Sequence, residues 1–239
     1  MRGLFVGLVM LVSAGAWAQG TPATLEERLF EAIDAGKELV AEGVMQGGRV
    51  NLDARNANGE TPLHRAVEKG MKELARQLLA AGSNLRARSK NGETVLHLAA
   101  LHVDPAIAAM LLDAGADPKA RNDDGESALH WAALSGHVLA GKLLLERGAD
   151  PNQADLRGNR PLHAAADSGN NEMVAVILSE TADPRAKNRD GLTAEDIARD
   201  RERPAAAALI AKARARPATQ SGTTNFGTID IDQQPKERF

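Results

Sequence analysis

The chain has no cysteine, no tyrosine and few aromatic side chains of any kind, at 3% of its 239 residues. The lack of cysteine excludes disulfide bonds, thiolate catalysis, cysteine-type zinc sites and a lipid-modified cysteine. Because aromatic residues are so scarce, the apolar 43% of the chain must build a core from Leu, Ala, Val and Ile. Small aliphatic side chains suit closely packed helices better than a sheet sandwich, so the composition favours a helical protein.

The first eighteen residues have the layout of a cleavable signal peptide. Arg2 supplies a positive start, residues 3–13 are apolar, and Ala16-Trp17-Ala18 offers a small-x-small cleavage site. A transmembrane anchor is the alternative, but an apolar run of this length is too short to span a bilayer comfortably. We therefore predict that residues 1–18 are removed on export, and no later segment is apolar enough to anchor the chain. An exported chain without cysteine fits the bacterial periplasm best, because secreted eukaryotic domains more often carry disulfides.

The charge balance is weakly acidic. The whole chain has a formal net charge of −3, and removal of the signal takes away Arg2 and no acid, which leaves −4. Such a chain has no global reason to bind nucleic acid or anionic lipid. A protein partner is therefore expected, without nucleic acid and without a membrane span in the mature chain.

A short motif recurs at a fixed interval along the sequence. It reads Thr61-Pro62-Leu63-His64 at its first occurrence, and later copies follow in steps of 33 residues. Those copies are Thr94-Val95-Leu96-His97, Ser127-Ala128-Leu129-His130, Arg160-Pro161-Leu162-His163 and a degenerate Leu192-Thr193-Ala194. A glycine stands just before each copy, and aliphatic pairs such as Leu78-Leu79 keep the same phase. A fixed period of this length is typical of stacked repeat architectures.

Each position of the repeat has a physical reason. Dipeptides such as Asn58-Gly59 supply the positive φ of a tight turn and predict a hairpin tip. A hydroxyl residue such as Thr61 caps the first helix of each pair. Glycines such as Gly70 allow a sharp turn between two helices, and Gly82 ends the second helix.

These residues resemble the ankyrin repeat, and the resemblance covers nearly all of residues 25–215. It implies an all-α solenoid in which helix-turn-helix pairs are stacked and joined by β-hairpin loops, and we expect the chain to be a monomer. The implied organisation is an N-terminal capping repeat at 19–57, four repeats at 58–90, 91–123, 124–156 and 157–189, and a C-terminal capping repeat at 190–216. Residues 217–239 are rich in Thr, Ser, Gly, Gln and Asp, which predicts a disordered tail.

Four of the six histidines occupy the last position of the motif, namely His64, His97, His130 and His163. Neighbouring repeats stack at about 8–10 Å, whereas the ligands of one zinc ion converge to about 2 Å from it. A ladder with one histidine per repeat cannot bind one ion in this way, so no metal or other cofactor is expected. The ankyrin resemblance implies a structural role, in which each ring hydrogen-bonds its own turn and ties neighbouring repeats together.

Two departures from regularity lead to expectations about local structure. Val103 stands where the turn glycine should be, so Asp104 and Pro105 are expected to start the second helix of that repeat afresh. The hairpins also carry a basic row, interrupted at Ala154, and an acidic row five residues later. The basic row is Arg55, Arg88, Arg121 and Lys187, and the acidic row is Glu60, Glu93 and Glu126. We interpret the rows as weak cross-hairpin pairs of about 0–1 kcal/mol each, and we expect the C-terminal half, which lacks the glutamate, to be more cationic.

Ankyrin arrays bind partners with their hairpin tips and the inner face of their first helices, so the resemblance implies a strip of contact residues. At the tips the strip comprises Asn58, Lys90, Asp123, Asp124, Leu156 and Arg157. Along the first helices it comprises Glu68, Lys69, Leu101, His102, Leu134, Ser135, Asp167 and Ser168. Leu101 and Leu134 form an apolar centre among polar neighbours, as expected of an interface. Trp131 is expected to pack between repeats.

The leading hypothesis is a periplasmic protein that binds another periplasmic or envelope protein through this groove and these tips. It would restrain or protect an enzyme, either as an inhibitor or immunity-like protein or as an accessory factor for stress tolerance. The alternative is a general structural scaffold of the envelope with several weak partners. An enzyme is least expected, because the chain has no Gly-x-Ser-x-Gly elbow, no His-Glu-x-x-His helix and no phosphate-binding loop.

Overall fold

The computed structural model describes residues 24–180 and 182–215, and this part of the chain forms twelve helices. In chain order they are α1 (Leu25–Asp34), α2 (Glu38–Gln46), α3 (Pro62–Glu68), α4 (Lys72–Ala80), α5 (Val95–Ala99), α6 (Ala106–Asp113), α7 (Ala128–Ser135), α8 (Val138–Glu146), α9 (Pro161–Ser168), α10 (Asn171–Ser179), α11 (Ala194–Asp200) and α12 (Pro204–Arg214). The predicted signal peptide at 1–18 and the predicted tail at 217–239 lie outside the described residues.

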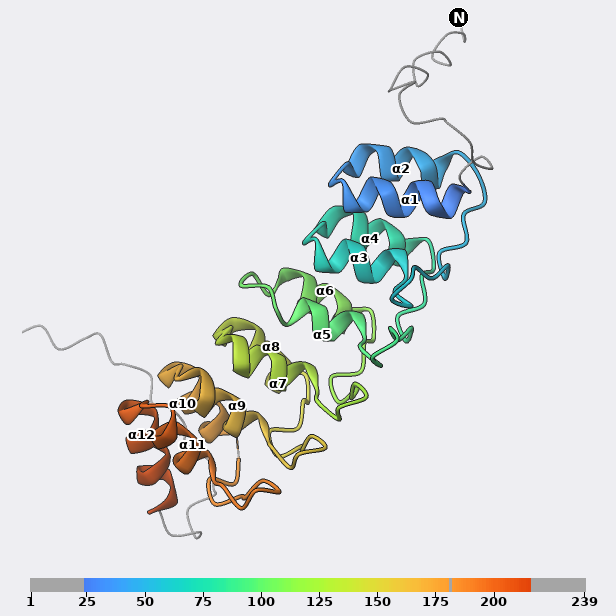
Figure 1. Ribbon diagram of the computed structural model, residues 1–239. Helices are drawn as coiled ribbons and strands as arrows, with labels where there is room; N and C mark the ends of the chain where they lie inside the picture. Colours follow the sequence, from blue (N-terminus) through green and yellow to red (C-terminus); the bar gives the residue numbers. More distant parts are fainter. Residues whose placement is uncertain (1–23, 181, 216–239) are drawn as a thin grey trace, which may run out of the picture.

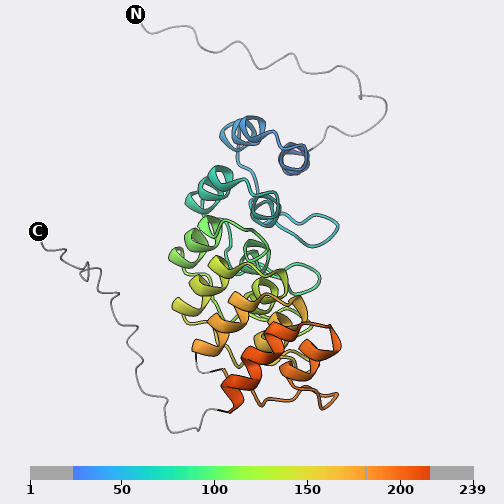
Figure 2. The ribbon, with the colours of Figure 1, turned by 90° about the vertical axis from the view of Figure 1, so that its left-hand side faces the viewer.

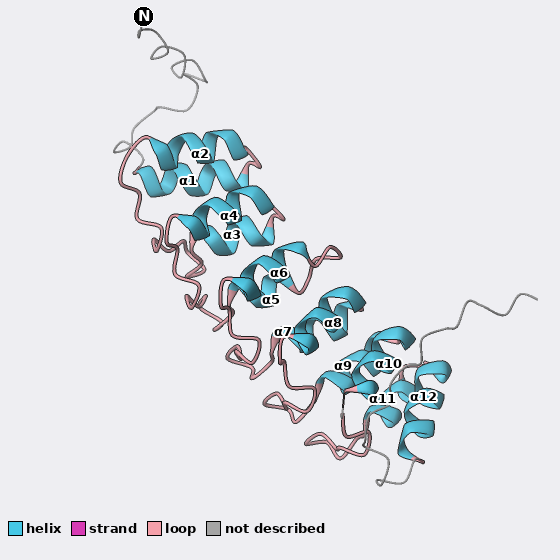
Figure 3. Ribbon diagram, turned by 180° about the vertical axis from the view of Figure 1, so that it is seen from behind, coloured by secondary structure: helices cyan, strands magenta, loops and turns pink. Residues whose placement is uncertain are grey.

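The helices are arranged as six antiparallel pairs that follow one another along a curved stack (Figure 1). Each first helix packs against the first helix of the next pair, and the second helices pack in the same way. Seen from the side, the pairs form two layers, and the long loops project beyond one of them (Figure 2). The view from behind shows these loops in a row along one edge of the stack (Figure 3). That edge and the first helices beside it form the surface on which the candidate site is found.

The core is a ladder of aliphatic side chains that repeats with the motif. The motif leucine of each first helix is buried: Leu63, Leu96, Leu129 and Leu162. The second helices contribute an equivalent buried row: Leu78, Leu111, Leu144 and Ile177. Buried alanines stand between these rows and let neighbouring helices approach closely. A core of this kind is continuous from one pair to the next, which is why it needs few aromatic residues.

Both described ends of the stack are closed by polar contacts. Thr24 caps α1 by accepting a hydrogen bond from the Glu27 N–H at 3.1 Å, and the Glu27 carboxylate accepts one from the Thr24 N–H at 2.8 Å. At the other end, the buried Glu195 of α11 forms ion pairs with Arg199 and with Arg214 of α12. The second of these pairs ties the last two described helices together.

The loops between pairs are hairpins that are hydrogen-bonded to one another. Within each hairpin an amide donates back across the loop, as in Asn122 N–H to the Glu126 carbonyl at 2.9 Å. Between hairpins, one tip amide donates to the preceding tip carbonyl. These links are Lys90 to Asn58 (2.8 Å), Asp123 to Asn91 (2.9 Å), Leu156 to Asp124 (2.8 Å) and Arg189 to Arg157 (2.9 Å). The tips therefore form one continuous backbone ladder along the edge of the stack.

The basic row reinforces this ladder in a way that differs from our expectation. The guanidinium of Arg88 donates to the Arg121 carbonyl at 2.6 Å, and that of Arg121 donates to the Ala154 carbonyl at 2.6 Å. Arg55 reaches the Arg88 carbonyl in the same manner, at 2.5 Å. The expected cross-hairpin pairs with the acidic row are therefore wrong: each arginine reaches forward by one repeat. The acidic row instead accepts hydrogen bonds from its own hairpin, from Asn56, Ser89 and Asn122.

The repeat in which Val103 replaces the turn glycine has a shortened first helix. Helix α5 has five residues, and α6 begins at Ala106, one residue beyond Pro105. The Asp104 carboxylate accepts a hydrogen bond from the Ala106 N–H at 3.0 Å, so it caps the new start, and Pro105 is the residue that precedes the helix. The rebuilt turn leaves Val103 exposed.

The backbone hydrogen bonds between hairpin tips predict that two glycines differ in how much their replacement destabilises the protein. Gly148 and Gly158 both have positive φ, at 90° and 79°. A Cβ at Gly148 would meet nothing within 4 Å, whereas one at Gly158 would lie 3.0 Å from the Arg189 backbone nitrogen. We expect Gly148→Ala to lower the free energy of unfolding by about 1–2 kcal/mol, the cost of the left-handed conformation alone. Gly158→Ala should cost about 3 kcal/mol or more, because it also pushes two hairpins apart.

Urea denaturation of the two variants measures this difference directly. Gly148→Ala is the matched control, since it makes the same chemical change at a similar φ. Equal losses in the two variants would show that the tip ladder contributes nothing to stability.

Candidate functional site

The motif histidines lie at the joins between successive repeats. In His97, Nδ1 accepts a hydrogen bond from the Thr94 N–H at 3.1 Å and lies 2.9 Å from the Thr94 hydroxyl. Its Nε2 lies 3.0 Å from the carbonyl oxygen of Glu126, in the next hairpin. The corresponding Nε2 contacts are His64 to Glu93 (3.3 Å), His130 to Asn159 (3.1 Å) and His163 to Leu192 (3.3 Å). Each ring thus joins its own helix start to the following hairpin.

This geometry specifies the protonation state of the rings. A backbone N–H can only donate and a carbonyl can only accept, so Nδ1 must be unprotonated and Nε2 must carry the hydrogen. Burial lowers the pKa of all four rings below the ordinary value of 6.5. A second proton would have to sit on Nδ1, facing a backbone N–H. The folded repeats therefore hold these histidines neutral.

A second set of side chains ties the turns between the two helices of each pair. His102 Nε2 lies 2.7 Å from the Val67 carbonyl, and His137 Nδ1 lies 3.2 Å from the Ala100 carbonyl. The Asn170 amide donates to the Gly136 carbonyl at 3.0 Å. His102 was predicted as a partner contact, but its ring is half-buried and already bonded to the preceding repeat.

The predicted contact residues at the tips are exposed, although their backbones belong to the ladder. The side chains of Asn58, Lys90, Asp124, Leu156 and Arg157 are all accessible to solvent. Asp123 is also exposed and lies 3.4 Å from the Arg88 guanidinium. The ladder fixes where each of these side chains starts, so the tips form an ordered surface.

The predicted contact residues along the first helices differ more widely in their surroundings. Glu68 is ion-paired with Arg65 of the same helix, and the Asp167 carboxylate lies 2.5 Å from Arg201 Nε. The Ser168 hydroxyl donates to the Ala165 carbonyl at 2.9 Å. Apart from the half-buried His102, the other predicted residues of these helices are exposed, namely Lys69, Leu101, Leu134 and Ser135.

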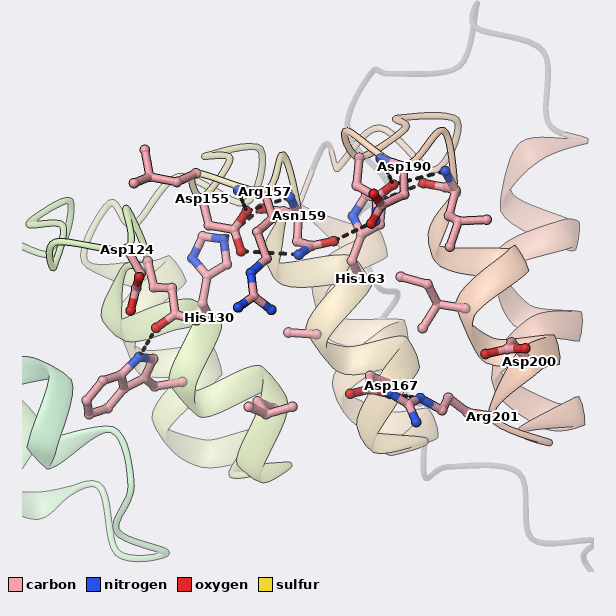
Figure 4. Close-up of a pocket in the computed structure, with 18 residues that line it drawn as sticks. Asp124, His130, Asp155, Arg157, Asn159, His163, Asp167, Asp190, Asp200 and Arg201 are labelled. Atoms are coloured by element: carbon pink, nitrogen blue, oxygen red, sulfur yellow. Dashed lines mark hydrogen bonds and ion pairs between the residues drawn. The ribbon is translucent and has the colours of Figure 1, made fainter.

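A groove of about 430 Å³ lies between the last hairpins and the first helices α7, α9 and α11 (Figure 4). Its apolar lining comprises Trp131, Leu134, Leu156, Ala164, Leu192 and Ile197. Its acidic lining comprises Asp124, Glu126, Asp155, Asp167, Asp190 and Asp200, and its basic lining is Arg157 and Arg201. The polar side chains His130, Asn159, His163 and Asn188 complete it.

The groove contains only some of the predicted contact residues. Asp124, Leu134, Leu156, Arg157 and Asp167 line it. The others lie elsewhere on the tips and helices: Asn58, Lys90, Asp123, Glu68, Lys69, Leu101, His102, Ser135 and Ser168. Leu134 of the predicted apolar centre lines the groove together with the exposed Leu156 and Leu192, whereas its predicted companion Leu101 does not.

Sequence reasoning missed one wall of this groove. Leu192, Asp190 and Ile197 belong to the last described hairpin and to α11, which we had treated only as a cap. A signal was present, because Leu192 stands at the position where the first three copies have glutamate. The groove itself is acidic, since six carboxylates face two guanidinium groups.

Trp131 connects the groove to the repeat before it. The indole Nε1 donates to the Glu126 carboxylate at 2.7 Å, and the indole and His97 rings form a T-shaped contact with centroids 5.4 Å apart. Trp131 is half-buried, so it packs between repeats and still contributes to the groove lining. An aromatic side chain held in this way is a rigid contact for a partner.

Neither a metal-binding cluster nor a membrane-spanning helix is found among the described residues. In residues 24–180 and 182–215, no three histidine or acidic side chains are grouped so as to hold a metal ion. Within the same residues, no helix has the length and hydropathy needed to cross a bilayer.

Comparison with known families identifies the architecture. A model of ankyrin repeats in three copies matches residues 29–122 and again residues 104–188, which together make up more than half of the chain. The chain belongs to the ankyrin-repeat family. No curated protein matched the sequence. The predicted fold, an all-α ankyrin solenoid, is confirmed, and ankyrin repeats mark the protein as a protein–protein interaction module.

Proposed function

We propose that the protein is exported to the periplasm and there binds one protein partner in the groove between α7 and α11. The partner would be an enzyme that the complex restrains or protects, as an inhibitor or immunity-like protein or a stress accessory factor does. The layout of residues 1–18 supports export. The family supports a protein as the partner.

A single observation carries the choice of the groove. Leu134, Leu156 and Leu192 are 52%, 51% and 42% exposed, and all three line this one hollow. Exposed apolar side chains inside a charged rim are the usual anatomy of a protein interface. The tip ladder holds Leu156 in place and the helix α7 holds Leu134, so little ordering is needed on binding.

Site-specific photo-cross-linking in the producing cells tests this function. A photoreactive amino acid replaces Leu134 in one variant and Leu139 in the other. Leu139 is the matched control, since it is 58% exposed but lies on α8, outside the groove. We expect one discrete adduct from position 134, recovered in the periplasmic fraction, and none of the same mass from position 139.

Other outcomes would contradict the proposal in different ways. Equal adducts from both positions, spread over many masses, would indicate a general scaffold with weak partners. An adduct confined to the cytoplasmic fraction would disprove the periplasmic location. The absence of any adduct at position 134 would move the binding surface away from the groove.

A further inference from the structure

The groove has a charge distribution that points to one kind of occupant, and this inference rests on the proposed function. Among the described residues, the carboxylates of Asp124, Asp190 and Asp200 have no hydrogen-bond or ion-pair partner. Two other acidic side chains, Glu126 and Asp155, accept hydrogen bonds from neutral donors only, namely an indole and backbone and side-chain amides. Asp167 is the acidic side chain of the lining that has a basic partner there.

The basic side chains of the lining do not offset these acids. Arg201 is held by Asp167 at 2.5 Å, and Arg157 reaches into the groove without an acidic partner among the described residues (Figure 4). Six carboxylates against two guanidinium groups give a formal balance of −4. A concave wall of one sign concentrates the opposite charge and repels anionic groups such as phosphates.

The placement of the acidic side chains relative to the leucines indicates where the cations of an occupant would lie. Asp124 lies at one end of the groove and Asp200 at the other (Figure 4). The exposed Leu134 and Leu156 belong to α7 and to the hairpin before α9, and Leu192 belongs to the hairpin before α11. An apolar anchor can therefore lie on the leucines while flanking cations meet carboxylates at both ends.

We propose that the groove receives a cationic segment of the partner protein, in which lysine or arginine side chains flank an apolar side chain. The contact with the exposed leucines positions the segment, and the unpaired carboxylates favour positively charged over negatively charged side chains. Arg157 is the like-charged exception in the lining, and it limits how many cations the segment can bring.

A defined peptide tests the proposal without knowledge of the partner. The probe is a short acetylated peptide in which lysine and leucine alternate, and its counterpart has glutamate in place of lysine. Trp131 reports binding, because it lines the groove and is the chain's only tryptophan besides Trp17, which is changed to phenylalanine. We expect saturable binding of the lysine peptide below about 1 mM, weakened by added salt, and no binding of the glutamate peptide.

Matched variants separate the groove from the overall charge of the protein. Asp124→Asn, Asp190→Asn and Asp200→Asn together should weaken the lysine peptide by about tenfold. Glu31→Gln, Glu146→Gln and Glu180→Gln change the net charge equally at exposed positions outside the groove, and should leave the affinity within about twofold. Arg157→Ala should strengthen binding.

Each remaining outcome counts against the proposal. Equal loss in the two triple variants would show that only net charge matters, and no binding of the lysine peptide would overturn the assignment. Self-association that the groove variant abolishes would make a second copy the occupant. If position 134 still cross-links to a partner whose attached segment lacks lysine and arginine, the cationic segment is disproved while the proposed function stands.

Discussion

Replacement of His97 by alanine is expected to lower the free energy of unfolding by about 3–5 kcal/mol. The side chain is fully buried, and its loss leaves a cavity between two repeats. It also leaves the Thr94 N–H without the Nδ1 acceptor that lies 3.1 Å away. The Glu126 carbonyl loses the ring Nε2 at 3.0 Å and, within the described part of the chain, keeps only the Asn122 N–H as a donor. Trp131 loses its T-shaped contact with the imidazole ring.

Thermal unfolding followed by circular dichroism measures this effect, and a decrease in Tm of roughly 10 °C is expected for a domain of this size. His102→Ala serves as the control, because that ring is half-buried and is hydrogen-bonded to the Val67 carbonyl alone among the described residues. It should cost only about 1 kcal/mol. If His97→Ala were no worse than the control, the ladder would not be the structural device that the geometry indicates.

Acidification is expected to destabilise the protein through its four buried motif histidines. The four motif histidines have folded-state pKa values below 6.5, because burial disfavours their charged form. Below pH 6.5 these histidines are protonated in the unfolded chain but not in the folded one. The free energy of unfolding therefore falls as the pH decreases toward the folded-state pKa values. Each ring can contribute a slope of up to about 1.4 kcal/mol per pH unit.

The carboxylates act in a separate and lower window. A hydrogen bond from Arg76 lowers the pKa of Glu73 to about 2, and hydrogen bonds from Thr193 lower the pKa of Asp196. Their stabilising effect is present above the unfolded values of 4.5 and 3.8 and is lost only as the pH falls below them. The histidine effect can therefore be isolated between about pH 7.5 and 5.5.

Urea midpoints across that range provide the measurement. The urea midpoint of the wild-type protein should fall steadily as the pH decreases. In the His97→Ala variant the free energy of unfolding should depend less steeply on pH, by an amount that corresponds to up to one proton. A midpoint that is constant between these values would mean that the rings accept protons in the folded state, in conflict with a bare Nδ1 that faces a backbone N–H.

The period of the sequence predicted the helix pairs because each position of the motif acts within its own repeat. A hydroxyl caps the helix that follows it, a leucine two residues later is buried, and a glycine provides a positive φ. Such local relations depend on the order of residues alone. For the same reason Val103 marked the one turn that had to be rebuilt.

Relations between repeats were harder to predict. Arg88 stands five residues before Glu93, and the sequence spacing suggested that they would pair. In the structure the stacking offset brings the Arg121 carbonyl within 2.6 Å of the guanidinium, and that offset is set by packing. The groove was missed in part for the same reason, since Leu134 and Leu192 line one surface only after α7, α9 and α11 have been stacked.

The forward-pointing arginines and histidines have a consequence for how such a chain can lengthen. Each of these donors needs only a carbonyl one unit ahead, so an additional 33-residue unit, spliced in at a matching position, finds acceptors at both of its junctions. Growth or shrinkage by whole units thus leaves every internal bond with a counterpart, whereas any other insertion length would break the register. The number of repeats can therefore change in evolution without any new kind of hydrogen bond between them.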